Sequence, residues 1–238
     1  MLLEIKHIDV LYSDFQVIWD LSLEVGEGKM VALLGPNGSG KSTVLNTISN
    51  LVHHRGGEIC FDGEVIGNQP THRRTALGIS HVLERRRVFP HLSVMQNLQL
   101  GAWHESAKAA RAESLKRVYQ IFPKLEARSG QLAHTMSGGE QQMLAIARGL
   151  MGLPRLLMVD EPFLGLSPMV MQDLIGIFRD IVEEGISILF VEQNVRLALG
   201  MADHGYVLES GKLVVSGNAS DLIDSDAVKH VFLGDAVR

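Results

Sequence analysis

The spacing of hydrophobic residues along the chain predicts both strands and helices. Apolar residues alternate with polar ones at positions 21–25, which is typical of a half-buried strand, and positions 3–10 show a weaker form of this pattern. Four short apolar runs are typical of strands buried on both faces, at residues 30–34, 79–83, 156–159 and 187–191. We therefore expect an α/β protein with a small N-terminal antiparallel sheet beside a parallel sheet.

Helical spacing is concentrated between residues 91 and 154. Ser93 is placed to cap a helix over residues 94–100, and a second helix is expected over residues 107–122. Later features are an apolar helical stripe that ends at Val182, a hairpin over residues 206–215 and a short helix capped by Asn218. The expected organisation is one domain, 1–238, with a core of residues 1–90 and 155–238 and an inserted helical subdomain of residues 91–154.

Composition disfavours several classes of protein. The 238 residues carry a formal net charge of −5 with basic residues spread along the chain, so no nucleic-acid partner is expected. Cys60 is the only cysteine, which excludes a disulfide within the chain and favours a small core residue. No apolar run approaches the ~20 residues of a membrane span, and the first residues do not resemble a secretory leader. A cytoplasmic protein is expected, unless a partner holds it at a membrane.

A glycine-rich loop joins the buried run at residues 30–34 to a segment with helical spacing. Its glycines leave backbone N–H groups free to surround a phosphate, and the helix N-terminus adds donors and a positive dipole end. Lys41 is placed to reach the β- and γ-phosphates, and Ser42 to offer its hydroxyl to Mg²⁺. The alternative, a chance glycine turn, is disfavoured by the strand and helix around it. The candidate phosphate-binding residues are Gly35, Pro36, Asn37, Gly38, Ser39, Gly40, Lys41, Ser42 and Thr43.

A second helix N-terminus carries similar features farther along the chain. Ser137 is placed to cap the helix, Gly138 and Gly139 open its first turn, and Glu140 follows. Such a terminus attracts anions for the reasons given for the first loop. The alternative is a capped helix start with an ordinary glycine turn. One phosphate loop does not need a second phosphate site nearby, so this motif requires an explanation of its own.

Acidic residues follow two of the predicted buried strands. Asp160 and Glu161 end the run at residues 156–159, and ligands gather at the carboxyl ends of strands in an open parallel sheet. Asp160 can hold Mg²⁺, and Glu161 can polarise a water that attacks the γ-phosphate. Glu84 leaves an earlier strand and precedes three arginines, for which an exposed charged loop is the alternative. Tyr12 could stack on a nucleotide base or pack at a strand end.

In this order along the chain, the phosphate loop, residues 137–141 and residues 156–161 resemble the motifs of the ATP-binding subunit of ABC transporters. The resemblance covers essentially the whole chain. It implies a P-loop NTPase with a RecA-like α/β core and parallel sheet, an N-terminal antiparallel β subdomain and an inserted α-helical subdomain. It also implies a head-to-tail dimer, in which Ser137 and Gly139 contact the γ-phosphate that Lys41 of the other subunit holds. That dimer would explain the second anion site.

The resemblance assigns a role to each candidate residue, with ATP and Mg²⁺ as cofactors. Tyr12 is implied to stack on the base. The implied catalytic residues are Glu161, Lys41 and Gln193. The implied signature that contacts ATP of the other subunit consists of Ser137, Gly138, Gly139 and Glu140. The implied metal site consists of Ser42 and Asp160, with Glu84 beside the ATP as an outer-sphere ligand.

Three positions depart from the usual pattern of the family. Glu84 stands where most members carry glutamine, Gln193 where most carry the switch histidine, and Ser167 where aspartate is usual. Gln193 can form a hydrogen bond to a γ-phosphate but does not titrate near neutral pH, so a role as proton acceptor is excluded. With residues 86–90 and 137–145, these positions resemble the smaller ATPase of the high-affinity branched-chain amino acid importer. The urea and amide importers are the nearest alternative.

The function implied by this resemblance is to power import of branched-chain amino acids by ATP hydrolysis. The implied partners are a second ATPase subunit, identical or different, two integral-membrane permease subunits and, indirectly, a periplasmic binding protein. The chain would lie in the cytoplasm on the inner face of the cell membrane, with a permease helix docked at Glu84, Arg86, Arg87 and residues 89–98. A soluble ABC ATPase acting on DNA or ribosomes, a nucleotide kinase and a binding module without hydrolysis are the rival classes. The length of the chain argues against the soluble ABC ATPase, and the second anion motif argues against the kinase. The intact catalytic residues argue against a binding module without hydrolysis.

Overall fold

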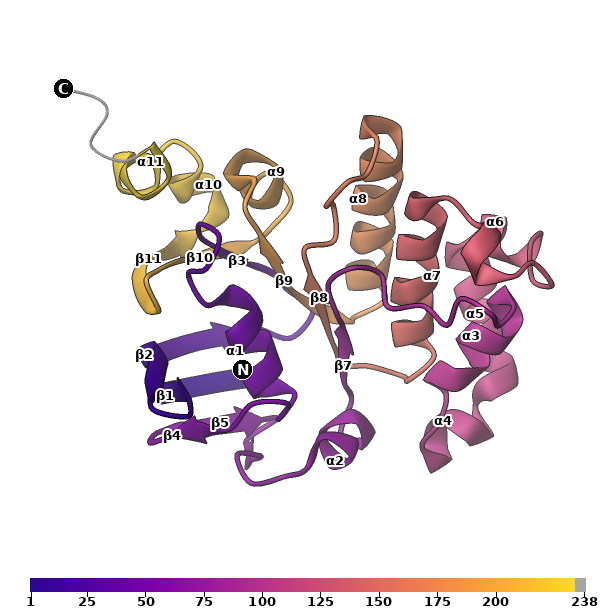
Figure 1. Ribbon diagram of the computed structural model, residues 1–238, viewed down its shortest axis with the longest axis horizontal. Coiled ribbons are helices and arrows are strands. Elements are labelled where there is room, and N and C mark those ends of the chain that lie inside the picture. The colour runs from indigo at the N-terminus through magenta and orange to yellow at the C-terminus, as the bar shows by residue number, and fades with distance from the viewer. Residues whose placement is uncertain (234–238) are drawn as a thin grey trace.

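The computed structural model describes residues 1–233, and two β-sheets form its centre (Figure 1). The first sheet is antiparallel, with the strand order β2-β1-β5-β6 and with β4 paired to β1. It confirms the predicted N-terminal antiparallel sheet, and Tyr12 is the last residue of its strand β1. The strands are β1 (Leu3–Tyr12), β2 (Phe15–Val25), β4 (His54–Arg55), β5 (Glu58–Phe61), which contains the buried Cys60, and β6 (Glu64–Val65).

The second sheet has the strand order β11-β10-β3-β9-β8-β7. Neighbouring strands are parallel except β10 and β11, which form the predicted hairpin. Whereas β3, β8 and β9 are buried along their whole length, Ser80 and His81 of the edge strand β7 are partly exposed. The prediction that β7 is buried on both faces is therefore wrong. The strands are β3 (Met30–Leu34), β7 (Ile79–Val82), β8 (Leu156–Asp160), β9 (Ser187–Glu192), β10 (His204–Glu209) and β11 (Lys212–Asn218).

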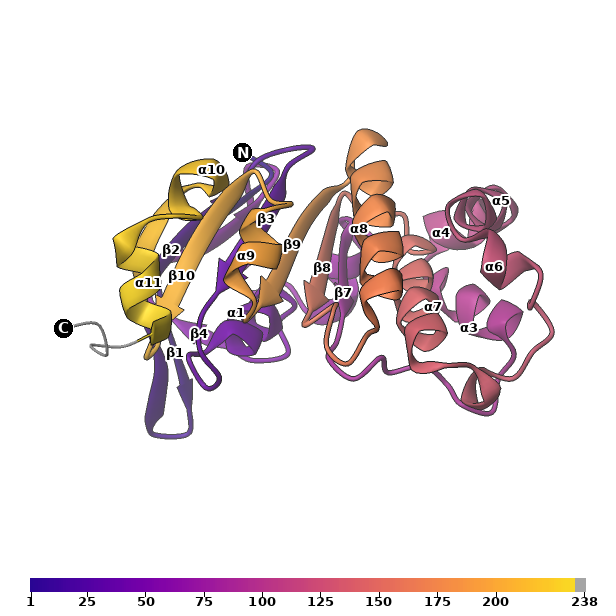
Figure 2. The ribbon, with the colours of Figure 1, turned by 90° about the horizontal axis from the view of Figure 1, so that it is seen from above.

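Successive residues of the central strands belong to two different hydrophobic cores. Ala32 of β3 packs in a core that includes α8 (Pro168–Glu183), whereas Val31 and Leu33 pack in a core with the antiparallel sheet and α1 (Lys41–Ile48). Successive side chains of a strand point to opposite faces, so a strand covered on both faces is apolar throughout. Figures 1 and 2 show the antiparallel sheet and α8 on opposite sides of the central strands.

The segment between β7 and β8 is largely helical, as predicted. Ser93 caps α3: its hydroxyl accepts a hydrogen bond from the Gln96 N–H, and the Gln96 side chain accepts one from the Ser93 N–H. Where residues 91–154 begin and end as a subdomain remains a prediction. The helices are α3 (Val94–Gly101), α4 (Glu105–Ala109), α5 (Arg111–Ile121), α6 (Pro123–Glu126), the 3₁₀ turn η1 (Ala133–Thr135) and α7 (Gly138–Leu150).

The single helix expected over residues 107–122 is wrong, because the chain breaks at Ala110 into α4 and α5. The ring of His104 caps α4 by accepting a hydrogen bond from the Ala107 N–H. A second hydrogen bond joins this ring to the Gly152 carbonyl oxygen, at 2.9 Å. The start of α4 is thus fixed from a distant part of the chain, and local spacing does not reveal it.

One smaller expectation near the C-terminus is confirmed and one needs correction. The α8 stripe includes the buried residues Leu174, Ile175 and Phe178, Val182 packs partly buried against the same core, and Ile181 is buried as well. Asn218 does not cap α10, because its side-chain NH₂ donates to the Asp221 carboxylate. The remaining helices are α2 (Thr71–Ala76), α9 (Val195–Leu199), α10 (Ala219–Leu222) and α11 (Asp226–Leu233).

Two observations concern the limits of the chain and its relation to membranes. Residues 234–238 of the expected domain lie outside the described residues. Within residues 1–233, the structure contains no helix that is long and apolar enough to cross a membrane.

A buried arginine holds the C-terminal end of α1. Arg74 of α2 is 1% exposed and donates hydrogen bonds to the carbonyl oxygens of Thr47, Ile48, Gly67 and Gln69. Burial lowers the pKa of the Arg74 guanidinium to about 10, so it stays charged at neutral pH. The last carbonyls of a helix lack partners within it, and Arg74 supplies them for α1. The helix that follows the phosphate loop is therefore anchored at its far end.

Candidate functional site

The glycine-rich loop runs from the carboxyl end of β3 to the N-terminus of α1, as predicted. Gly38 and Gly40 have φ angles of +80° and +106°, which non-glycine residues rarely adopt. At Gly35 a Cβ would collide with the Leu208 carbonyl oxygen. Because no side chain caps α1 and its first turn has no acidic residue, the first N–H groups of α1 remain available to an anion.

Lys41 is buried at the start of α1 and points back along the loop. Its ammonium donates hydrogen bonds to the carbonyl oxygens of Gly35, at 2.9 Å, and Pro36, at 3.1 Å. The Glu161 Oε1 atom is 3.8 Å from the Lys41 Nζ atom. Burial lowers the pKa of the Lys41 ammonium, and the nearby carboxylates of Glu161 and Asp160 oppose that shift. The Lys41 ammonium is thus fixed beside the loop, close to the carboxylates of Glu161 and Asp160.

Asp160 ends β8 and meets α1 across the site. The Ser42 hydroxyl donates a hydrogen bond of 3.1 Å to its Oδ1 atom. Burial raises the pKa of the Asp160 carboxyl to about 6, the Ser42 hydrogen bond opposes this shift, and the negative charge of Glu84 adds to it. The residues from three separate elements predicted to lie near the metal are therefore brought together.

The donors present suit a magnesium ion that also binds phosphate. Mg²⁺ is usually held by one or two carboxylates together with substrate phosphates, and Ser42 and Asp160 offer a hydroxyl and a carboxylate oxygen in contact with each other. Within the described residues, no cluster of three or more His, Cys, Asp or Glu side chains could hold a metal ion by itself. The site therefore fits Mg²⁺ bound together with a nucleotide, and not a metal site made by protein alone.

Glu161 and Gln193 form a pair at the carboxyl ends of β8 and β9. The Gln193 side-chain NH₂ donates a hydrogen bond of 2.9 Å to the Glu161 Oε1 atom. Glu161 has a φ of +48°, an uncommon conformation for a residue with a side chain and one that concentrates at functional sites. Since Lys41 lies beside the same oxygen, the three predicted catalytic residues share one location.

Glu192 supports this location and was not identified from the sequence. It is 5% exposed, and its carboxylate accepts hydrogen bonds from the N–H groups of Phe163 and Gln193. Burial raises the pKa of the Glu192 carboxyl, and the negative charge of Glu161 adds to the shift. Its position after a buried strand is the signal that had identified Asp160. Glu192 positions the chain on both sides of the Glu161–Gln193 pair.

These residues line a pocket of about 300 Å³. The Ser39 hydroxyl oxygen is buried and has no hydrogen-bond partner among the described residues, although it lies in the loop that would surround a phosphate. Tyr12 is not among the lining residues; its side chain is 45% exposed, and its hydroxyl is 3.4 Å from the Thr43 Oγ1 atom. The pocket is lined by Val17, Asn37, Gly38, Gly40, Lys41, Ser42, Thr43, Glu84, Glu161, Leu164 and Gln193.

The second anion motif lies outside this pocket, at the N-terminus of α7. Ser137 caps the helix, as predicted, by accepting a hydrogen bond from the Glu140 N–H, and the Glu140 carboxylate accepts one from the Ser137 N–H. Arg128 forms an ion pair of 3.1 Å with Glu140. The capping box therefore occupies two backbone donors at this helix start, and those of Gly138 and Gly139 remain available.

Comparison with known proteins identifies the family of the chain. Residues 18–164, which include the phosphate loop, the α7 start and Glu161, match the family described as ABC transporter. The chain belongs to this family. It is an ABC transporter ATPase, the subunit that binds ATP.

The similarity of this ABC ATPase to curated relatives extends over nearly the whole chain. It is 39% identical over 233 residues to the high-affinity branched-chain amino acid transport ATP-binding protein BraG of Pseudomonas aeruginosa, covering 98% of this chain and all of BraG. It is 34% identical to the probable branched-chain amino acid transport ATP-binding protein LivF of Archaeoglobus fulgidus, covering 94% of each chain. It is 32% identical to the lipopolysaccharide export system ATP-binding protein LptB of Haemophilus influenzae, covering 95% of each chain.

Solved structures confirm the predicted fold of the ABC ATPase. A nucleotide-free ATP-binding cassette from an ABC transporter superposes with a TM-score of 0.86 at 23% identity, covering 98% of this chain and 99% of that one. A dimeric cassette in a post-hydrolysis state with ADP and phosphate gives a TM-score of 0.78 at 23% identity, covering 91% of this chain and 98% of that one. The P-loop fold with its antiparallel N-terminal sheet, mixed parallel sheet and helical portion is thus shared.

Proposed function

We propose that this ABC ATPase powers the import of branched-chain amino acids. The observation that carries the proposal is the full-length similarity to BraG, at 39% identity, with a second branched-chain relative, LivF, at 34%. Glu84, Gln193 and Ser167, which depart from the usual family pattern, agree with it. Lipopolysaccharide export is a second candidate because LptB is 32% identical over nearly the whole chain. Urea or amide import is a third candidate, which rests on the sequence resemblance alone.

The geometry supports a mechanism in which two ATP molecules lie between two ATPase subunits. In each pocket, Lys41, the loop N–H groups and Ser39 bind the phosphates, and Ser42 and Asp160 would hold Mg²⁺. The ion, when bound, neutralises charge that develops on the phosphate oxygens. Glu161 orients and polarises the attacking water, and Gln193 keeps the Glu161 carboxylate in place by donating a hydrogen bond to it.

The helix start at α7 completes the site of the other subunit in this mechanism. The Ser137 hydroxyl and the Gly139 N–H would contact the γ-phosphate of that ATP, while Tyr12 stacks on the adenine of its own. The separation of Ser137 from the Lys41 pocket within one chain supports a shared site. The second subunit is a copy of this chain or a related ATPase. Dimerisation therefore precedes hydrolysis.

Glu161→Gln tests the catalytic assignment. General-base assistance is typically worth about 10²–10⁴ in rate, so the variant should lose nearly all turnover and keep MgATP binding. Phosphate release and equilibrium binding of ATP measure the two properties. Glu64→Gln, at an exposed carboxylate of β6, is the matched control and should behave as the parent protein. Parental hydrolysis by Glu161→Gln would refute the assignment.

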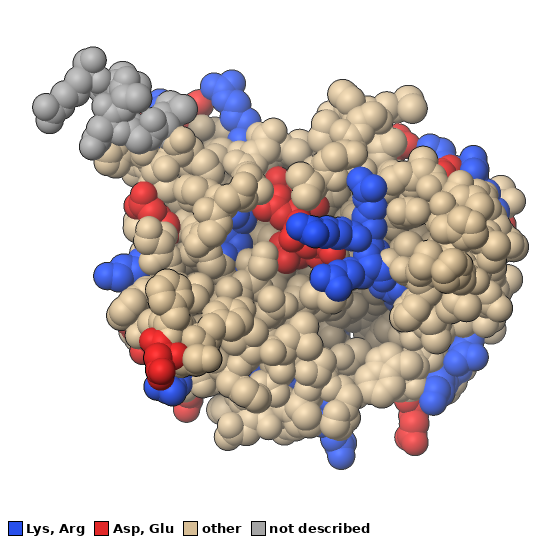
Figure 3. Space-filling view, in the orientation of Figure 1, with Lys and Arg blue, Asp and Glu red and all other residues tan. Residues whose placement is uncertain are grey.

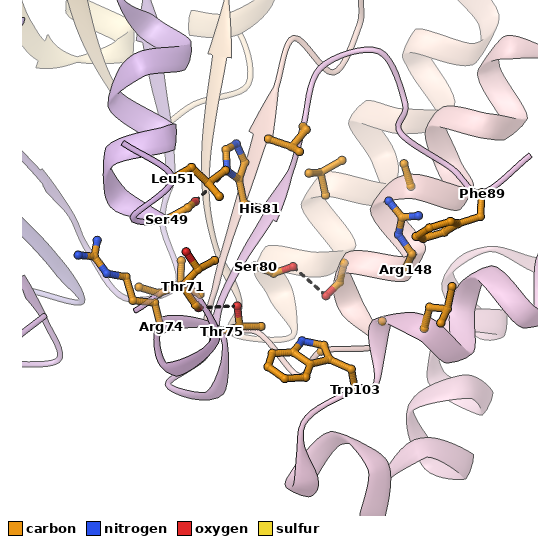
Figure 4. Close-up of a pocket in the computed structure, with 18 residues that line it drawn as sticks. Ser49, Leu51, Thr71, Arg74, Thr75, Ser80, His81, Phe89, Trp103 and Arg148 are labelled. Carbon is orange, nitrogen blue, oxygen red and sulfur yellow. Dashed lines mark hydrogen bonds between the residues drawn. The ribbon is translucent and has the colours of Figure 1, made fainter. Parts of the chain in front are cut away.

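A groove beside the nucleotide pocket suits a helix of the permease subunits. It has a volume of about 440 Å³, and Figure 4 shows Ser80 and His81 of β7 at its centre, with Phe89 and Trp103 beyond them. Phe89 and Trp103 are 49% and 45% exposed. The groove lining contains no Asp or Glu; of its two arginines, Arg74 is engaged with backbone carbonyl oxygens, whereas the Arg148 Nη1 atom has no hydrogen-bond partner among the described residues. We therefore propose a cytoplasmic permease helix with an apolar face and an acidic residue as its occupant.

The residues of the docking surface expected from the sequence lie in two different pockets. Phe89 lines the groove, whereas Glu84 lines the phosphate pocket. We propose that the short segment between them links the nucleotide to the permease contact, with the ATPase on the inner face of the cell membrane. Trp103→Ala should weaken copurification with the permease and leave permease-free hydrolysis unchanged. Trp19→Ala, at a tryptophan that is 44% exposed on β2, is the matched control.

The transported solute is tested in the assembled transporter. Leucine supplied with its binding protein should stimulate ATP hydrolysis and accumulate inside vesicles. Urea and short amides should do neither. Stimulation by lipopolysaccharide components, with none by leucine, would reverse the order of the first two candidates while leaving the ATPase mechanism intact.

A further inference from the structure

The segment that joins the phosphate pocket to the groove has an unusual backbone. Arg85, Arg86 and Arg87 have φ angles of +64°, +64° and +26° in succession. The Arg148 guanidinium holds the end of the segment by donating a hydrogen bond of 2.7 Å to the Arg87 carbonyl oxygen. The same guanidinium lies 5.3 Å from the centre of the Phe89 ring. The side chains of Arg85 and Arg86 contact different partners, Glu84 for Arg85 and the carbonyl oxygens of Leu164 and Gly165 for Arg86.

Arg86 lies against the signature motif. Its Nη1 atom is the nearest heavy atom to the position that a Cβ on Gly138 would occupy. Its Nη2 atom donates to the carbonyl oxygens of Leu164 and Gly165, both at the long distance of 3.4 Å. Leu164 lines the phosphate pocket, so Arg86 connects the loop after Glu161 with the N-terminus of α7. Arg86 is not among the residues that line the groove, and a docking role for it remains a prediction.

The charge of Arg86 is not neutralised in the isolated chain. Within the described residues it forms no ion pair, whereas the neighbouring Arg85 lies 3.5 Å from Glu84. A helix N-terminus repels a cation because its dipole is positive there. An anion that contacts both the guanidinium and the helix N-terminus would form charge-assisted hydrogen bonds stronger than the two long ones that hold Arg86 now. Figure 3 shows basic and acidic side chains gathered at the centre of this face.

We propose that Arg86 binds the γ-phosphate of the ATP held by the other subunit, together with Ser137 and Gly139. The proposal rests on the head-to-tail dimer of the proposed function. Lys41 is the only basic residue that lines the pocket within the described chain, and Gln193 is neutral. A guanidinium delivered by the partner adds the positive charge that this pocket lacks when charge develops on the phosphoryl group. Before the subunits meet, Arg86 rests on the carbonyls of Leu164 and Gly165.

Arg86→Ala, Arg86→Lys and the control Arg85→Ala test the proposal. Arginines supplied in trans accelerate phosphoryl transfer strongly, so we expect Arg86→Ala to lower kcat about 10- to 100-fold and Arg86→Lys to restore part of it. ATP binding by the single subunit should stay within about twofold of the parent, because the pocket around Lys41 is intact. Arg85→Ala should hydrolyse ATP as the parent does, because the Arg85 side chain is 82% exposed.

A second measurement is made in the Glu161→Gln background, where ATP should hold the dimer together. There Arg86→Ala should shift ATP-driven dimerisation, measured by analytical ultracentrifugation, to higher protein concentration. Parental kcat and dimerisation in Arg86→Ala would overturn the proposal. So would loss of permease-stimulated hydrolysis alone, since that result assigns Arg86 to docking. If the parent protein hydrolyses ATP with a rate linear in protein concentration, the proposed dimer fails, whatever Arg86 does.

Discussion

The two helix N-termini that bear on phosphate binding, those of α1 and α7, are built in opposite ways. No side chain caps α1, its first turn lacks an acid, and its first residue is the buried Lys41. In contrast, α7 is closed by the capping box of Ser137 and Glu140, and Glu140 is paired with Arg128. The first helix start therefore depends on a ligand to satisfy its donors, whereas two of the donors at the second are satisfied by its own residues.

This difference matches the way in which the two sites are used in the proposed mechanism. The α1 site binds the phosphates of the nucleotide held by its own subunit, so its open donors are used as soon as ATP binds. The α7 site meets phosphate only when two subunits come together, and it must stay folded while it is exposed to water. A capping box achieves this because it satisfies donors of the first turn without filling the space over Gly138 and Gly139.

Lys41→Met removes the cation at the start of α1 and should have the largest effect on the nucleotide site. The ammonium forms charge-assisted hydrogen bonds that transfer to the phosphates, each worth about 1.5–3 kcal/mol, so MgATP affinity should fall about 100-fold or more. Equilibrium dialysis with labelled ATP measures the loss. Lys6→Met, at an exposed lysine of β1, is the control. Binding within about twofold of the parent would show that the loop amides suffice.

Ser137→Asp separates helix capping at α7 from phosphate binding, because aspartate caps a helix as well as serine does. Thermal stability should therefore be parental, while the new carboxylate repels the incoming γ-phosphate and lowers hydrolysis about 10- to 100-fold. ATP binding by the single subunit should not change. Ser137→Ala should instead cost about 1 kcal/mol of stability through loss of the cap. Full activity of the transporter assembled with Ser137→Asp would contradict the shared phosphate site.

Asp160→Asn tests whether the buried carboxylate at the α1 site destabilises the fold, and its expected effect on stability is modest. The folded-state pKa of Asp160, about 6, lies above its ordinary value of 3.8, so its contribution to stability is complete below pH 3.8 and is lost as the pH rises through 6. Asparagine resembles the protonated form and should stabilise the nucleotide-free protein at neutral pH by about 1–3 kcal/mol. Denaturant unfolding at several pH values measures this difference.

The same variant should lose magnesium-dependent hydrolysis, because asparagine is a poorer ligand for a hard cation. Equal stability of parent and Asp160→Asn at pH 7 would show that Ser42 and water already compensate the buried charge. Asp173→Asn is a control on α8, where the carboxylate is exposed and paired with Lys124.

The sequence was sufficient for the parts of the site that local chemistry specifies. Period-two alternation, buried runs and glycines placed β1, β2, β3 and the phosphate loop, and two acids after a buried run located Asp160 and Glu161. Because the strands are parallel, their carboxyl ends meet at one edge, which is why Gln193 arrives beside Glu161.

Features that depend on distant contacts were missed. The start of α4 is held by His104 and its contact with Gly152, and Ser80 and His81 of β7 are only partly covered by the elements that pack on the sheet. The direction of Arg86 could not be inferred either, since three consecutive arginines look equivalent in a sequence. Their backbone conformation and the Arg148 contact separate them, and both require the folded chain.

The alternation of β3, β8 and β9 between two cores has a consequence for the chemistry at their ends. Successive residues of these strands face different layers. A shift of one residue in register would therefore move every side chain of the strand into the opposite core. The phosphate loop, Glu161 and Gln193 follow these strands. Packing on both faces of the strands therefore keeps them aligned along one edge of the sheet. The surfaces that meet other subunits can therefore diverge between transporters of different solutes while the alignment of the hydrolytic groups stays the same.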